Sequence, residues 1–120
     1  SVPAGCVGTA VTPGNSGAWG AWTSLGTTIR PSSEWTLAAQ MSNTTVATLA
    51  YFFELGWGDA TTPIRVIGKN WCLTTTGENT YWYYNTPSAN YSIPEGATLY
   101  VRATCSGTSD TGWTAAAYGV

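Results

Sequence analysis

Catalysis draws mainly on residues that transfer protons or form covalent intermediates, and this chain has few of them. It contains no histidine, so neither a Ser-His-Asp set nor a histidine general base is available. The GxSxG turn and the phosphate loops GxxxxGK[ST] and GxGxxG are also missing. Paired carboxylates are the remaining route to a hydrolase. The six carboxylates are Glu34, Glu54, Asp59, Glu78, Glu95 and Asp110.

Five of these six carboxylates lie beside turn residues or strand ends, where a solvated loop carboxylate is the expected role. We therefore predict a protein that is not an enzyme and needs no cofactor. Zinc is not expected, because the chain has neither histidine nor a CxxC pair, and we predict no metal site. A secreted enzyme or a calcium-dependent adhesin that uses carboxylates such as Asp59 and Asp110 is an alternative.

Glu54 and Arg102 differ from the other charged residues because each lies within an otherwise apolar segment. A charge in the middle of a strand is costly unless it is paired. We predict that both residues belong to a structural ion pair, within one subunit or between subunits. A ligand-binding role is the alternative.

Aromatic residues are unusually abundant, with seven tryptophans and seven tyrosines. Such side chains serve a core, an interface or a carbohydrate site equally well. Alternation along the chain assigns a first group to the core: Trp35, Tyr51, Phe53 and Trp57. The run Tyr81, Trp82, Tyr83 and Tyr84 cannot point inward throughout, so at least half of it must face a partner subunit, a capsid surface or a ligand.

Charge is scarce: charged residues make up 8% of the chain, against roughly 25% in ordinary soluble domains. The net charge of −2 and the lack of a basic cluster argue against nucleic-acid binding. The longest apolar run, 47–53, is far shorter than the ~20 residues of a membrane helix, so we expect no membrane association. The opening SVPAGC shows no sign of a targeting segment. The length indicates a single domain over residues 1–120.

Three cysteines at long spacings, Cys6, Cys72 and Cys105, do not resemble a disulfide scaffold. We expect three buried thiols in a chain made in a reducing compartment. One disulfide with a spare thiol is the alternative.

Short segments with strand character and no credible helix follow one another along the chain. The expected strands are 6–12, 18–29, 34–43, 45–58, 62–76 with a break or bend at 68–70, 80–85, 99–105 and 113–120. The turn signature Ile93-Pro94-Glu95-Gly96 precedes the last two. This pattern predicts an all-β protein, an antiparallel β-sandwich of about eight short strands, resembling a jelly roll.

The segment 45–58 has nearly lost the period-two alternation, since Val46, Ala50 and Phe52 are apolar among the opposite positions. A strand of that kind needs cover on both faces, and a chain of 120 residues has little material for a third layer. We therefore predict that Phe52, together with the run 81–84, faces another subunit or a capsid surface.

Four stretches resemble small virion proteins of tailed bacteriophages. They are WGAWTSL at 19–25, ELGWGDATTPIRVI at 54–67, IPEGATLYVRATCSGTSD at 93–110 and the terminal Tyr118-Gly119. The resemblance implies a jelly-roll virion component without catalytic activity, such as a capsid decoration protein, a head fibre or a tail-tip piece. It also implies that the chain is made in the host cytoplasm and resides in the virion, with the major capsid protein as a partner.

Together these observations favour a structural protein of the phage particle, a capsid decoration or head-surface protein that forms a symmetric homo-oligomer, with a trimer preferred. The alternative is a carbohydrate-binding or host-receptor-binding module in which Trp82, Tyr84 or Trp57 stacks on a surface glycan.

Overall fold

The structure, a computed structural model, describes residues 9–29, 31, 35–41, 49–73, 80–85, 92–108 and 113–119. These residues form strands joined by turns and irregular segments, with no helix among them. The strands are β1 (Thr9–Val11), β2 (Thr23–Thr27), β3 (Trp35–Met41), β4 (Ala50–Trp57), β5 (Ile64–Leu73), β6 (Thr80–Asn85), β7 (Thr98–Cys105) and β8 (Trp113–Gly119). The predicted all-β class is confirmed.

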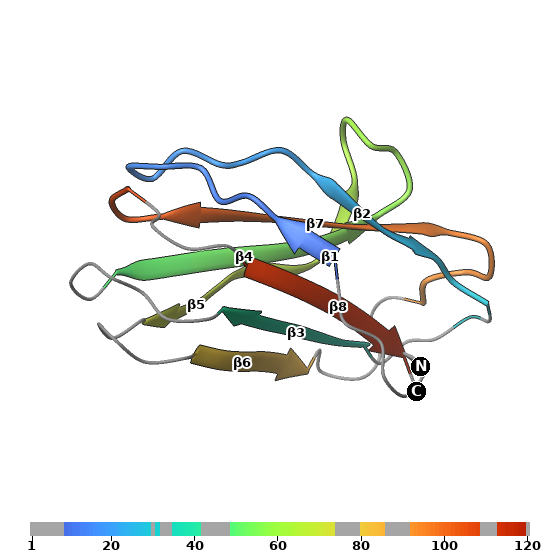
Figure 1. The fold of residues 1–120 in the computed structure, drawn as a ribbon. Coiled ribbons are helices and arrows are strands. Elements are labelled where there is room, and N and C mark those ends of the chain that lie inside the picture. Colours follow the sequence, from blue (N-terminus) through green and yellow to red (C-terminus); the bar gives the residue numbers. More distant parts are fainter. Residues whose placement is uncertain are drawn as a thin grey trace.

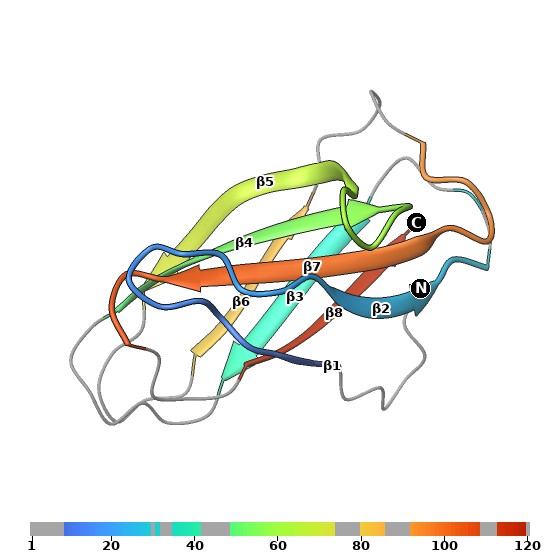
Figure 2. The ribbon, with the colours of Figure 1, turned by 90° about the horizontal axis from the view of Figure 1, so that it is seen from above.

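The described strands form two antiparallel sheets, and Figure 1 shows them as two layers. The strand order is β1-β8-β3-β6 in one sheet and β2-β7-β4-β5 in the other. Strands β5 and β6 therefore lie at sheet edges, while β4 and β7 lie side by side inside the second sheet, as Figure 2 shows.

Two predicted strands differ from the observed ones. The strand expected over 18–29 is reduced to Thr23–Thr27, and residues 18–22 form an irregular segment instead. The strand is not broken at 68–70, where a break or a bend was expected, because β5 runs continuously from Ile64 to Leu73. The irregularity appears as register shifts in the pairing of β4 with β5, around Glu54. A bulge of that kind accommodates an extra residue without ending the strand.

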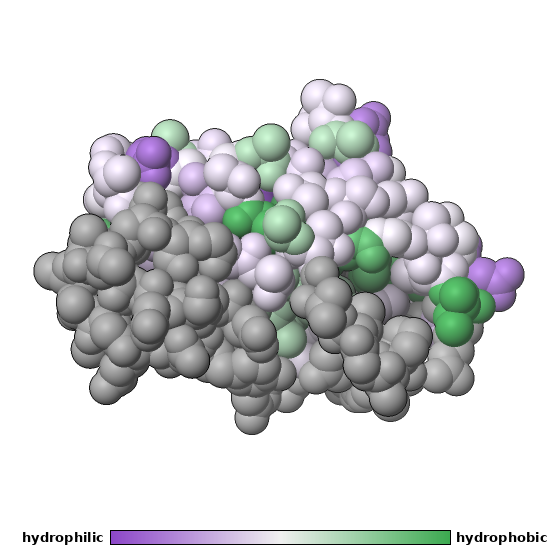
Figure 3. Space-filling view, in the orientation of Figure 1, coloured by the Kyte–Doolittle hydropathy of each residue, from purple (hydrophilic) through white to green (hydrophobic). Residues whose placement is uncertain are grey.

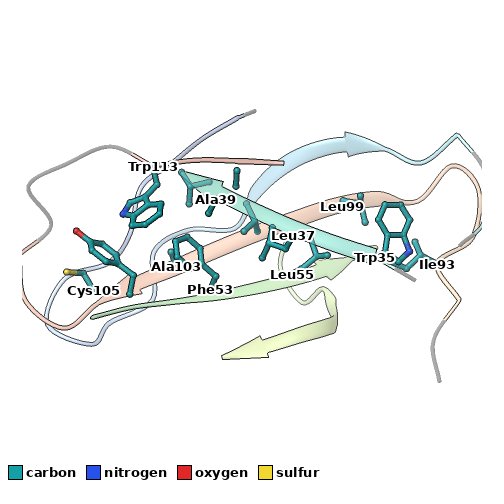
Figure 4. Packing of buried hydrophobic residues seen from close by; sticks show 14 of the residues in the cluster. Trp35, Leu37, Ala39, Phe53, Leu55, Ile93, Leu99, Ala103, Cys105 and Trp113 are labelled. Atoms are coloured by element: carbon teal, nitrogen blue, oxygen red, sulfur yellow. The ribbon is translucent and has the colours of Figure 1, made fainter. Parts of the chain in front are cut away.

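The hydrophobic core lies between the sheets and draws on both of them (Figure 4). Tyr51 and Phe53 of β4 contact the indole of Trp113 edge-on, with ring centroids 4.9 and 5.1 Å apart. This edge-to-face arrangement is favourable for aromatic pairs. Trp35 is buried at the other end of the cluster, and Trp57 packs partly buried against it. The four aromatic residues assigned to the core thus lie there.

The Thr28 side chain connects the end of β2 with the turn before β7 through two hydrogen bonds. Its hydroxyl donates a hydrogen bond to the Pro94 carbonyl at 2.6 Å and accepts one from the Ala97 amide at 3.1 Å. The turn itself runs from Pro94 to Ala97, one residue later than predicted, with Gly96 at a φ of 78°. A glycine meets this positive φ without strain.

Candidate functional site

The outer face of the β2-β7-β4-β5 sheet carries a buried ion pair. Cross-strand register places Glu54 of β4 opposite Arg102 of β7. The Arg102 Nε and Nη2 atoms donate to the same carboxylate oxygen, Oε1 of Glu54, at 2.8 and 2.7 Å. The Glu54 side chain is only 1% exposed and that of Arg102 22%. The two residues predicted to belong to a structural ion pair therefore lie together within one chain.

Two tryptophans cover the guanidinium of this pair. The Arg102 Cζ atom lies 4.5 Å from the ring centroid of Trp19 and 4.5 Å from that of Trp22. Each contact has the geometry of a cation–π interaction. The two rings thus cover the charged end of Arg102 on the outer face of the sheet.

The tryptophans reach this position because the segment 12–22 runs close against β7. The amides of Gly14 and Gly20 both donate to the Ala103 carbonyl, at 3.1 and 2.9 Å, and the Gly14 carbonyl accepts from the Cys105 amide at 2.7 Å. A Cβ atom at Gly14 would overlap the Ala18 carbonyl oxygen, and one at Gly20 would overlap that of Thr12. Only glycine permits so close a backbone approach.

Sequence reasoning missed this tryptophan cover. It read 18–29 as a strand, which would place Trp19 and Trp22 on opposite faces. The sequence signal that could have indicated this path is the presence of Gly14 before Trp19 and Gly20 after it. Glycines at these positions allow the backbone to approach β7 closely, where the charge of Arg102 requires cover.

A pocket of about 200 Å³ lies next to the ion pair on the same outer face. Its lining consists of Gly17, Trp19, Ala50, Phe52, Thr104, Cys105 and Ser106. Phe52 is 37% exposed, and the register places it opposite Thr104. The hydroxyl oxygen of Thr104 is buried and has no hydrogen-bond partner. Phe52, predicted to face a partner, is thus one of the exposed large apolar side chains.

Strand β6 contains the other predicted interface residues, Tyr81, Trp82, Tyr83 and Tyr84. The structure describes their backbone but not their side chains. The register pairs positions 82 and 84 with the buried Ala39 and Leu37, and positions 81 and 83 with Gln40 and Ala38. Each sheet face therefore receives two of the four positions.

Acidic groups do not gather at this site. Asp59 accepts a hydrogen bond from the Thr61 amide at 2.7 Å in an exposed turn, and Glu95 is exposed beside Gly96. Glu34, Glu78 and Asp110 fall outside the described residues. Within the described ranges, no three histidine, cysteine or acidic side chains come together as metal ligands.

Cys105 is a free, buried thiol. Cys6 and the side chain of Cys72 lie outside the described residues, so the expectation of three buried thiols stays a prediction for those two. No helix long and apolar enough to cross a membrane occurs in the described ranges.

Most of the surface seen in Figure 3 is neither strongly hydrophilic nor strongly hydrophobic where the structure describes it. The site thus combines a covered ion pair, exposed aromatic surface and a small neutral pocket, and none of these offers a nucleophile with an adjacent base. Comparison of the chain with protein-family models, with curated proteins and with solved structures gave no match.

Proposed function

We propose that this chain is a non-enzymatic structural protein of a bacteriophage particle, a capsid decoration or head-surface protein that works as a symmetric homo-oligomer. The sequence resemblance to small virion proteins of tailed phages supports the proposal. So does the strand order β1-β8-β3-β6 and β2-β7-β4-β5, because a jelly roll folds two Greek keys into two four-stranded antiparallel sheets. We therefore propose a jelly-roll sandwich as the fold.

The observation that carries the assembly proposal is the exposure of large apolar side chains on a chain with little charge. Ile29 is 77% exposed and Ile64 50%. A single exposed apolar residue needs no explanation, whereas a group of them on a surface poor in charge is typical of a contact surface.

Ile29 and Ile64 belong to the same end of the β2-β7-β4-β5 sheet. Across the sheet, Ile64 lies opposite Trp57, and Trp57 lies opposite Leu99. The residue before Leu99 is Thr98, which lies opposite Thr27 of β2. Ile29 follows two residues after Thr27. We call these two isoleucines the isoleucine end, and we propose that it contacts a neighbouring subunit in a closed ring, with three subunits as the expected number.

The test is the mass of the protein in native buffer, measured by light scattering or native mass spectrometry at micromolar concentration. We expect a mass near three times the 12.6 kDa of the chain. Ile64→Asp should shift the population toward the monomer, because it places a charge in an apolar contact. Thr62→Asp is the matched control, since Thr62 is exposed two residues away. A stable monomer for the unmodified chain refutes the assembly proposal.

Residence in the particle has a separate test. Mass spectrometry of purified phage should find the chain in intact particles, and a reconstruction should place it on the outer surface of the capsid. Finding the chain only in the soluble fraction of the infected cell would refute the virion assignment and leave the oligomer unaffected.

A further inference from the structure

The pocket beside Phe52, which we call the Phe52 pocket, has the chemistry of a neutral binding site. Phe52 and Trp19 give it aromatic walls, and none of the described residues of its lining carries a charge. Its volume of about 200 Å³ is below the roughly 300–1,000 Å³ that holds a drug-sized ligand. It therefore has room for one ring rather than for an extended molecule.

Two hydroxyl groups of the lining are left with unused hydrogen-bonding capacity. Thr104 is 5% exposed, and its Oγ1 atom is buried without a partner. The Ser106 hydroxyl accepts a hydrogen bond from the Ala50 amide at 3.0 Å, which leaves its proton free to be donated. A buried hydroxyl without a partner is costly, so this pocket favours an occupant that offers hydroxyl groups of its own.

We propose that the Phe52 pocket binds a single neutral pyranose ring, presented at the end of a surface saccharide. An apolar C–H face of the sugar would lie against the Phe52 ring, and sugar hydroxyls would bond to Thr104 and Ser106. An apolar side chain from another subunit would fill the same volume and leave the Thr104 hydroxyl unpaired, which disfavours it. A sugar ring can pack against the aromatic wall and form hydrogen bonds with both hydroxyl groups.

This inference goes beyond the proposed structural function and does not compete with it for surface. Phe52 lies five residues from Trp57, the partner of Ile64, so the pocket and the isoleucine end are roughly 17 Å apart along β4. Phe52 is then a ligand-binding residue, and the proposed assembly rests on the isoleucine end.

Saturation-transfer NMR with free methyl glycosides tests the proposal on the full chain. The probes are the methyl glycosides of glucose, galactose, mannose and N-acetylglucosamine. We expect at least one to bind with a Kd on the order of 1 mM, as a ligand of this size allows. Absence of saturation transfer to all four, with a folded protein of normal oligomeric mass, overturns the inference.

Substitutions locate the binding site. Thr104→Val removes the hydroxyl at nearly constant shape and should weaken binding about tenfold. Phe52→Ala removes one wall and provides an independent test, because this side chain lies outside the core. Thr62→Ala, at an exposed position at the other end of the sheet, is the control and should bind as the unmodified chain does. Unchanged binding by both Thr104→Val and Phe52→Ala overturns the inference.

Trp19 and Trp22 offer a second, matched comparison. Both rings lie 4.5 Å from the Arg102 Cζ atom, but only Trp19 lines the Phe52 pocket. Trp19→Ala should therefore weaken sugar binding much more than Trp22→Ala. Equal losses would mean that binding follows the cover of the ion pair rather than the pocket, and would overturn the inference. The native mass of the same samples reports on assembly separately.

Discussion

Removing Arg102 should destabilise the protein strongly, because Glu54 would stay buried and lose the guanidinium that lies against its carboxylate. Glu54 is 1% exposed and receives two hydrogen bonds from one guanidinium. Breaking a buried ion pair from one side costs about 3–5 kcal/mol. Because the Arg102 side chain is 22% exposed, water can partly replace it, and we expect about 3 kcal/mol for Arg102→Met.

The complementary change, Glu54→Gln, should cost less. It replaces the buried carboxylate by a neutral amide of similar shape and leaves Arg102 between Trp19 and Trp22. We expect about 1–2 kcal/mol, the cost of weakening hydrogen bonds to a charged group. The double variant carries no buried charge, so it should be more stable than the sum of the single effects indicates, with a coupling of about 2 kcal/mol.

Urea unfolding followed by tryptophan fluorescence measures these differences. With an m-value of about 1–3 kcal/mol/M, a loss of 3 kcal/mol lowers the midpoint by roughly 1–3 M. The protomer concentration must be held constant, because assembly adds to apparent stability. High salt should change the coupling little, since a buried pair is poorly screened. Additivity of the single effects within about 0.5 kcal/mol would refute the idea that the pair acts as a unit.

Three further predictions concern the parts of the fold that support this face. Thr28→Val removes both hydrogen bonds to the turn before β7 and should cost about 1–3 kcal/mol in urea unfolding, whereas Ser24→Ala, on the exposed side of β2, should have a small effect. Gly20→Ala should lower the melting temperature by several degrees at least, because the new Cβ meets the Thr12 carbonyl oxygen; an unchanged melting temperature would show that the segment 12–22 does not lie against β7. Cys105 is buried and free, so peptide mapping after brief native alkylation should find it unmodified, and rapid labelling would contradict its burial.

Alternation in the sequence predicted the core well because it depends on local geometry. In a strand, successive side chains point to opposite faces, so Trp35, Tyr51 and Phe53 could be assigned to the core from their positions in the chain, and each of these three is buried. The position of Trp19 and Trp22 could not be obtained in this way. It depends on the path of the segment 12–22 across β7, and that path is fixed by hydrogen bonds between residues more than 80 positions apart in the chain, such as Gly14 and Ala103.

The loss of alternation in β4 predicted cover on both faces of the strand, and a neighbouring subunit was the expected source of the outer cover. The structure divides that outer face into two parts. At Glu54 the cover comes from the chain itself, through Arg102 and the two tryptophans, because a buried charge needs a partner held in place before any assembly occurs. Two residues earlier, Phe52 is left 37% exposed. An uncharged side chain there can stay exposed at little cost in the free protein, so this position, unlike Glu54, is free to serve an external ligand.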